Sequence, residues 1–228
     1  MQESTQGHVA VATIVSTLAE VQMLVCNVHG VPWTEFKEVT MAVSQSTHFT
    51  PELVHSSFAQ VLHAAGPDQS RAPKLALYAW IVGRWDIDVT TIHEDGTTHQ
   101  GHGEIHAGWV LQGLAIQDVW MIPRLRDRHA GIEPLPGAGN WYGTTLRIYD
   151  PALDAWRILW NDPATNFFSQ QIARAQGRDI VQAGPDPRGG SMRWTFSQIE
   201  PQSFHWTAER AADDRNWRRE VDIRARRA

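Results

Sequence analysis

The chain of 228 residues has little of what marks several broad classes of protein. Its single cysteine, Cys26, excludes an internal disulfide framework and is expected to be a core thiol of a protein in a reducing compartment. No Lys or Arg precedes the apolar stretch 9–28, so a secretory signal is not expected, and Glu20 and Gln22 make this stretch a poor membrane span. We therefore expect a cytoplasmic protein without a membrane span.

The chain also lacks the short motifs of several enzyme classes. It contains no Gly-x-Ser-x-Gly elbow, phosphate-binding loop, Rossmann fingerprint or His-Glu-x-x-His helix. A net charge of −5 gives no reason to expect a nucleic acid as partner. No cofactor is expected from these patterns.

Tryptophan and basic residues are distributed unevenly. Ten of the eleven tryptophans and eighteen of the twenty Lys and Arg residues follow Ala72. The turn-forming stretch from Gly66 to Ser70 lies just before this change in composition. We therefore expect two parts, an N-terminal extension over residues 1–70 that is partly helical and a second domain over residues 71–228.

The extension contains one clear helix start. Thr50 can accept hydrogen bonds from the free amides of a first helical turn, and Pro51 has no amide hydrogen to leave unpaired there. Apolar residues follow at helical spacing: Val54, Phe58, Val61 and Leu62. This helix is expected to pack on the second domain or on a second copy in a homodimer. A lid and a loosely ordered extension are the alternatives.

The second domain is predicted to consist of strands. Residues 85–90 alternate between apolar and polar, which is typical of a strand with one buried face. Further runs of this kind are separated by turn residues, among them Asp95–Gly96, Gln112–Gly113 and residues 151–154. The pattern predicts an all-β, antiparallel barrel of about eight to ten strands.

A helical turn that leads into a Gly-x-Trp strand at residues 83–85 resembles the opening of lipocalin-like (calycin) barrels. In that family the tryptophan closes one end and an arginine of the last strand packs over it. The resemblance implies this pairing for Trp85 with Arg219, the charged member of an apolar stripe, or with Arg224. Arg226 and Arg227 are expected to form a solvated end.

Five segments, the first of which contains this Gly-x-Trp, resemble a bacterial family of lipocalin-like barrels over residues 73–227. They are GRWD (83–86), GWVL (108–111), IQDVW (116–120), YGTTLR (142–147) and YDPALDAWR (149–157). This resemblance implies a fold and transfers no catalytic residue.

Hairpin turns predict which side chains share a face, because residues opposite one another in an antiparallel pair point the same way. A two-residue turn at Gln112–Gly113 places Asp118 on an otherwise apolar face. A four-residue loop at 151–154 places Arg147 on an aromatic face. Since a lone buried charge is costly, we expect Asp118 and Arg147 to pair with each other or with a ligand.

The leading functional hypothesis is that the barrel binds a small, largely apolar or amphipathic molecule. The expected ligand-binding residues are Trp109, Trp120, Tyr149, Trp156, Trp160, Trp194 and Trp206. An isomerase or cyclase of the calycin type, with Asp118 as acid or base and Arg147 holding negative charge, is the first alternative. A structural or dimerising protein without a ligand is the second.

Three residues on one face of a strand, His102, Glu104 and His106, form a weak alternative metal site. A two-residue turn at Asp95–Gly96 would point them inward. The apolar face built across the Gln112–Gly113 turn, from Ile105 to Trp120, points them outward. A bulge at Gly96 would remove this conflict, and we favour the outward arrangement. A haem-binding barrel that uses His205 or His106 is an equally weak possibility.

Overall fold

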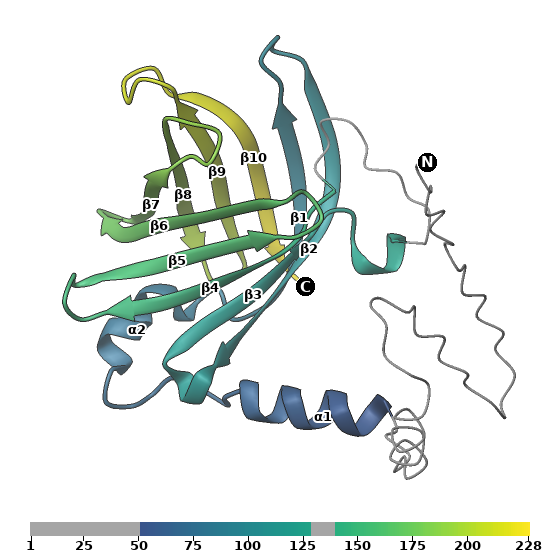
Figure 1. Ribbon diagram of the computed structural model, residues 1–228, viewed down its shortest axis with the longest axis vertical. Coiled ribbons are helices and arrows are strands. Elements are labelled where there is room, and N and C mark those ends of the chain that lie inside the picture. Colours follow the sequence, from purple (N-terminus) through teal and green to yellow (C-terminus); the bar gives the residue numbers. More distant parts are fainter. Residues whose placement is uncertain (1–50, 129–139) are drawn as a thin grey trace, which may run out of the picture. The chain divides into compact units, whose positions relative to one another are not determined.

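Antiparallel strands close into a barrel in the computed structural model of this protein, which describes residues 51–128 and 140–228 (Figure 1). Neighbours in the sequence pair throughout, and β1 closes the ring by pairing with β10. The strands are β1 Gly83–Ile92, β2 Thr98–Val110, β3 Ala115–Met121, β4 Tyr142–Asp150, β5 Ala155–Asp162, β6 Phe167–Gln176, β7 Asp179–Pro185, β8 Ser191–Glu200, β9 Ser203–Ala211 and β10 Arg218–Arg227. The predicted antiparallel, lipocalin-like barrel is confirmed.

Short helices precede or interrupt the strands. They are α1 Pro51–Leu62, α2 Ala72–Ala79, and the 3-10 turns η3 Leu111–Gly113 and η4 Leu125–Asp127. The helix predicted after Thr50 is therefore present. Residues 1–50 of the extension, with Cys26, lie outside the described residues. Within the part that the structure describes, no helix has the length and apolar character needed to cross a membrane.

The two ends of the barrel differ. The hairpins β2–β3, β4–β5, β6–β7 and β8–β9 lie at one end together with the start of β1 and the end of β10. Helix α2 packs there, with the Tyr78 ring 4.9 Å from the Trp156 ring and 6.2 Å from the Phe196 ring. We call this the α2 end. The other five hairpins form the opposite end, which we call the mouth.

Trp85 and Arg227 close the α2 end. Trp85 is fully buried, and its indole N–H donates to the carbonyl of Ile81 at 2.7 Å. The guanidinium carbon of Arg227 lies 4.0 Å from the centroid of the Trp85 ring. Arg227 also donates to the carbonyls of Trp80 and Val82 at 2.8 and 3.0 Å.

The expectation that Arg219 or Arg224 would cover Trp85 is therefore wrong, as is the expectation of a solvated Arg227. A register shift between Arg219 and Val221 breaks the alternation of β10, so Arg219 points outward and pairs with Asp222. Arg224 is on the outer face as well and donates to Gln198. A single extra residue in a strand reverses the face of the sheet to which every side chain before it points.

Two of the three predicted hairpin registers are confirmed. Trp109 opposes Ile116 across the β2–β3 turn, and Tyr149 opposes Trp156 across the β4–β5 turn. The third register, which assumed a two-residue turn at Asp95–Gly96, is wrong. There His93 N–H donates to the carbonyl of Thr97, and Gly96 takes the extra, left-handed position with φ of +83°. The glycine bulge thus sets the outward orientation of the His102 face.

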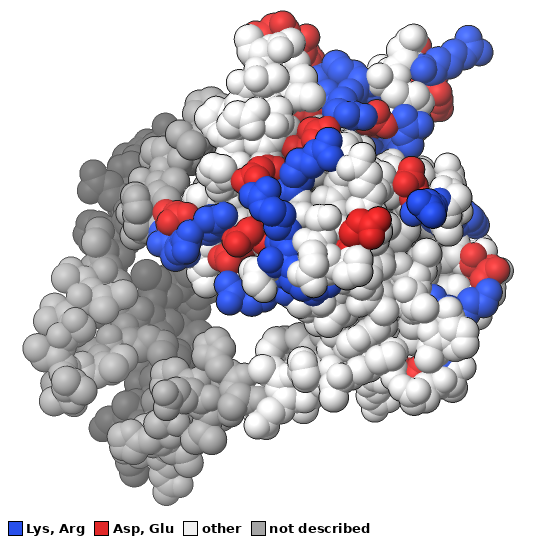
Figure 2. Space-filling model, turned by 180° about the vertical axis from the view of Figure 1, so that it is seen from behind, with Lys and Arg blue, Asp and Glu red and all other residues white. Residues whose placement is uncertain are grey.

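Charges of both signs alternate on the outer wall. Figure 2 shows acidic side chains among basic ones on this face, without a large patch of one sign. Acidic and basic side chains form ion pairs on β1 and its neighbours, where Asp88 binds Arg226 at 2.7 Å and His102 at 2.8 Å.

Candidate functional site

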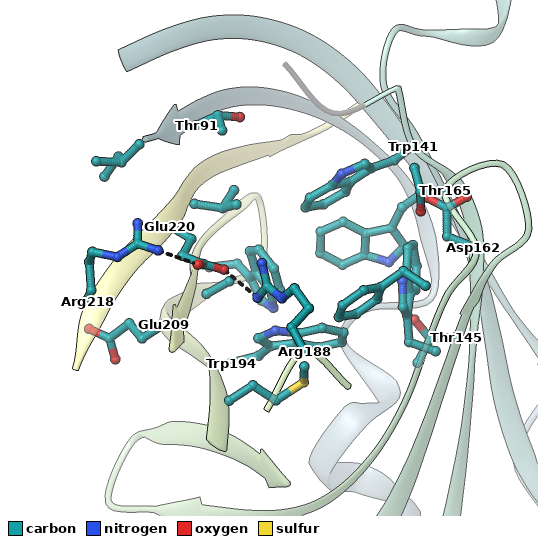
Figure 3. Close-up of a pocket in the computed structure, with 18 of the residues that line it drawn as sticks. Thr91, Trp141, Thr145, Asp162, Thr165, Arg188, Trp194, Glu209, Arg218 and Glu220 are labelled. Atoms are coloured by element: carbon teal, nitrogen blue, oxygen red, sulfur yellow. Dashed lines mark hydrogen bonds and ion pairs between the residues drawn. The ribbon is translucent and has the colours of Figure 1, made fainter. Parts of the chain in front are cut away.

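A cavity of about 450 Å³ opens at the mouth of the barrel. Its walls come from the mouth-end halves of the strands, where inward side chains are large and aromatic (Figure 3). The apolar lining residues are Ile92, Trp120, Trp141, Trp160, Phe167, Met192, Trp194, Trp206, Ala208 and Val221. Neighbouring indoles meet edge-on or tilted, as for Trp160 with Trp194 at 6.2 Å and Trp194 with Trp206 at 5.6 Å.

Trp141 is a wall residue that the sequence patterns did not indicate. It lies one residue before β4 and outside any alternating run. Backbone contacts hold it in place, because its carbonyl accepts from the N–H of Ile122 at 3.0 Å and from the guanidinium of Arg128. Its ring reaches the Trp160 ring at 6.1 Å.

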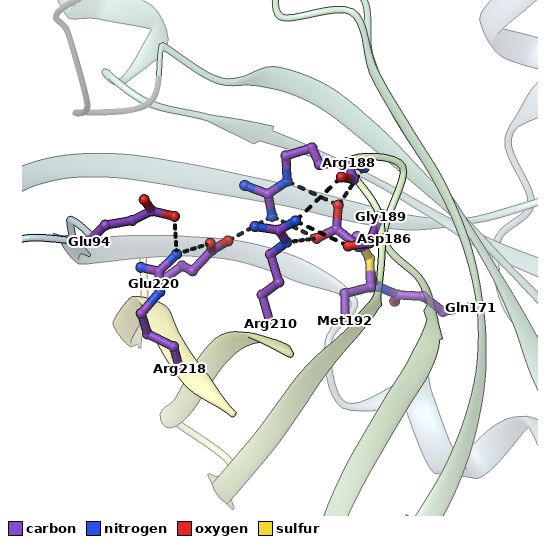
Figure 4. A network of polar contacts seen from close by, with 9 residues as sticks. All are labelled: Glu94, Gln171, Asp186, Arg188, Gly189, Met192, Arg210, Arg218 and Glu220. Carbon is purple, nitrogen blue, oxygen red and sulfur yellow. Dashed lines mark hydrogen bonds and ion pairs between the residues drawn. The ribbon is translucent and has the colours of Figure 1, made fainter. Parts of the chain in front are cut away.

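A network of ion pairs lies on one side of the mouth (Figures 3 and 4). Glu220 binds Arg188 at 2.8 Å and Arg218 at 2.7 Å, and Arg218 extends to Glu94 at 3.2 Å. Glu220 is the residue at the register shift of β10, so the same bulge that turns Arg219 outward brings Glu220 and Arg218 to the cavity. Sequence alternation alone could not reveal this.

Asp186 anchors the network from the β7–β8 turn. Its side chain is fully buried and accepts from Arg188 at 2.7 and 3.0 Å, with the guanidinium of Arg210 at 3.4 Å. Burial alone would raise the pKa of the Asp186 carboxyl, but the hydrogen bonds from Arg188 outweigh it and hold this pKa below its usual value. Asp186 thus stays ionised and fixes the direction of Arg188.

Arg147 and Asp118 form the buried ion pair that the sequence suggested. Nη1 of Arg147 donates to Oδ2 of Asp118, and the N–H of Thr145 donates to Oδ1 at 3.2 Å. Their exposed fractions are 2% and 1%. Burial raises the pKa of Asp118, and the positive charge of Arg147 opposes this shift. Arg147 lines the floor of the cavity above the Tyr78 ring, whereas Asp118 does not line it.

The seven predicted ligand-binding residues separate into two groups. Trp120, Trp160, Trp194 and Trp206 line the cavity. The other three lie nearer the α2 end. Trp109 is part of the buried core, and Tyr149 and Trp156 line a separate depression of about 350 Å³ beside α2. The reason is position along the strand, since these three residues adjoin the β2–β3 and β4–β5 turns.

The three histidines of the predicted metal and haem sites, His102, His106 and His205, lie on the outer wall. His106 and Glu104 are 3.2 Å apart, Glu104 accepts from the N–H of Leu125 at 2.7 Å, and His102 binds Asp88. His205 binds Asp222 at 2.8 Å on the outside of β9. Neither His106 nor His205 lines the cavity. No group of three or more His, Cys, Asp or Glu with the arrangement of a metal site occurs in residues 51–128 and 140–228.

The fold and the cavity define a lipocalin-like, ten-stranded antiparallel barrel with a tryptophan-lined pocket at its mouth. Rv2717c from M. tuberculosis is one similar solved structure, with a TM-score of 0.49 and 10% identity over 68% of this chain and 98% of that chain. S-type phycobiliprotein lyase CPES from Guillardia theta is another, with a TM-score of 0.46 and 10% identity over 71% and 98%.

These likenesses concern the fold and carry no information on function. No protein-family model matches the chain, and no curated protein matches it in sequence. Membership of the bacterial family that the sequence resembles therefore stays a prediction.

Proposed function

We propose that the barrel binds one small, largely apolar molecule in the cavity at its mouth. The observation that carries this proposal is a cavity of about 450 Å³ whose walls include five tryptophans. Binding sites for small molecules are typically concavities of about 300–1,000 Å³, mostly apolar, with a few polar groups that orient the ligand. Here the charged network at the mouth and Arg147 at the floor supply those polar groups.

The geometry gives little support to acid–base catalysis by Asp118. Its two carboxylate oxygens are occupied by Arg147 and the Thr145 amide, and it is not a lining residue. The ion pair between Asp118 and Arg147 accounts for the presence of both buried charges without a catalytic role. The cytoplasmic location and the homodimer expected from the sequence stay predictions.

The test is a titration with N-phenyl-1-naphthylamine, a neutral apolar probe whose fluorescence rises in an apolar environment. The protein is expected to bind one equivalent, with energy transfer from its tryptophans to the probe. In the Ala208→Leu variant a larger side chain enters the cavity, and the affinity should fall about tenfold or more.

The matched control is Ala183→Leu, the same change at an exposed position of β7. It should bind like the wild type. Absence of saturable binding by the wild type, or equal affinity of the two leucine variants, would contradict the proposal.

A further inference from the structure

Asp162 is a buried carboxylate in the wall of the cavity. It ends β5, where alternation directs Trp156, Ile158, Trp160 and Asp162 to the inside of the barrel. Its exposed fraction is 1%. Figure 3 shows it on the same side of the cavity as Trp141 and Thr165.

Asp162 differs from the other charged residues of the cavity because no side chain of the described residues forms an ion pair with it. The other lining residues that carry charge are Glu94, Arg147, Arg188, Glu209, Arg218 and Glu220. Each of them is in an ion pair with another side chain. Among residues 51–128 and 140–228 Asp162 makes no ion pair, and it accepts a hydrogen bond from the backbone N–H of Ala164 at 3.1 Å.

The arginines at the mouth of the cavity form ion pairs with other carboxylates. Arg218 and Glu220 belong to β10, and β10 and β5 are five strands apart in either direction around the ring. They therefore lie across the cavity from Asp162, as Figure 3 also shows. Arg188 is directed to Asp186 and Glu220 by its hydrogen bonds.

An unpaired carboxylate removed from water is unfavourable, and a cation beside it relieves the cost. The surroundings of Asp162 suit an organic cation. Trp160 precedes it by two residues on the same face, and the rings of Trp141 and Trp194 lie 6.1 and 6.2 Å from that of Trp160. Indole faces attract cations, and this attraction strengthens when water is excluded.

Building on the proposed function, we propose that the ligand of this cavity is an organic ammonium compound with an apolar body. Its positive group lies against the carboxylate of Asp162 and the neighbouring indoles, and its body fills the space between the remaining tryptophans. A metal ion suits the site less well, because the described residues provide no cluster of three His, Cys, Asp or Glu ligands.

The experiment compares three naphthalene probes that differ in charge, by isothermal titration calorimetry. They are 1-naphthylmethyl-trimethylammonium, neutral 1-naphthalenemethanol and anionic 1-naphthaleneacetate. The full-length protein is expected to bind the cation about tenfold more tightly than the alcohol, and the anion most weakly.

The variant is Asp162→Asn, which keeps an oxygen for the Ala164 amide and removes the charge. It should lose the preference for the cation while its affinity for the alcohol stays unchanged. Asp213→Asn is the matched control, because Asp213 also accepts from a turn amide at the mouth end but is exposed. It should keep the full preference.

Each outcome separates the two proposals. If the alcohol binds and the cation is not preferred, or if Asp162→Asn keeps the preference, the ammonium proposal is wrong and the small-molecule cavity stands. If none of the three naphthalenes and no N-phenyl-1-naphthylamine binds, both proposals are wrong.

Discussion

Arg227 shows how much a single side chain contributes to closing the barrel. It stacks on Trp85 and donates to three backbone carbonyls, those of Trp80, Val82 and Pro201, so its charge is used for packing rather than for solubility. It also explains Gly83, where φ is +126° and a Cβ atom would lie 2.5 Å from Nη1 of Arg227. The neighbouring Arg226 is exposed and pairs with Asp88.

We predict that Arg227→Ala lowers the free energy of unfolding by about 2 kcal/mol or more, because a cation–π contact and three charge-assisted hydrogen bonds are lost. Arg226→Ala removes an exposed ion pair and should cost less than about 1 kcal/mol. Urea unfolding of both variants measures the difference. Equal losses would show that Arg227 does not hold the α2 end.

The Arg147–Asp118 pair leads to a second prediction at this scale. Arg147→Met leaves a buried carboxylate without its cation and should lower the free energy of unfolding by about 3–5 kcal/mol at pH 7. The double variant Arg147→Met, Asp118→Leu removes both charges and should recover most of this loss. A double variant as unstable as the single one would mean that packing, not charge, causes the effect.

The pH dependence of the single variant follows from the direction of the Asp118 shift. Burial raises the pKa of Asp118 above its usual 3.8, and no arginine opposes it in this variant. The folded chain then binds a proton at Asp118 more readily than the unfolded chain does. Protonation of Asp118 therefore contributes most to the free energy of unfolding below pH 3.8, and this contribution is lost as pH rises through the pKa of the folded state. The deficit relative to wild type should shrink between pH 7 and pH 4.

At the scale of the elements, the paired strands β4 and β5 form part of the cavity wall. The backbone of β4 comes close there to a side chain of β5. Gly143 is the second residue of β4, and a Cβ atom there would lie 2.4 Å from the Trp160 ring and 2.8 Å from the carbonyl of Asn161. Neither the ring nor the backbone can move without disturbing the pairing. The missing Cβ atom of Gly143 therefore allows the Trp160 ring to lie close to the backbone of β4.

We predict that Gly143→Ala costs about 1–3 kcal/mol of stability and weakens binding of N-phenyl-1-naphthylamine, because Trp160 is displaced. Gly108→Ala in β2 is the matched control, since a Cβ atom there has nothing within 4 Å. It should be neutral or slightly stabilising. Thermal unfolding and the probe titration report both effects, and tolerance of Gly143→Ala would contradict this account of the wall.

The elements also show what a sequence can predict. The turns at 111–114 and 151–154 lie between runs that are apolar on one face only, so register followed from the pattern, and with it the meeting of Asp118 and Arg147. The bulge of β10 could not be predicted, because one extra residue reverses the face of a strand without leaving a mark in the alternating pattern. At the β1–β2 turn the sequence left two registers open, and the structure has the favoured one, with the bulge at Gly96.

At the scale of the whole molecule, the barrel divides its aromatic residues between two tasks. Those near the α2 end fill the core with Tyr78 and Trp85, and those near the mouth surround the cavity. The sequence predicted that these side chains point inward but not their height along the barrel. That height follows from the topology, because alternate hairpins of an up-and-down barrel lie at opposite ends.

The most direct measurement is a crystal structure of the protein soaked with N-phenyl-1-naphthylamine. We predict that the probe lies inside the barrel, between the indoles of Trp160 and Trp194, with the Arg147–Asp118 pair intact beneath it. An interior filled by the tryptophans themselves, with the probe absent or bound to the outer wall, would contradict the account.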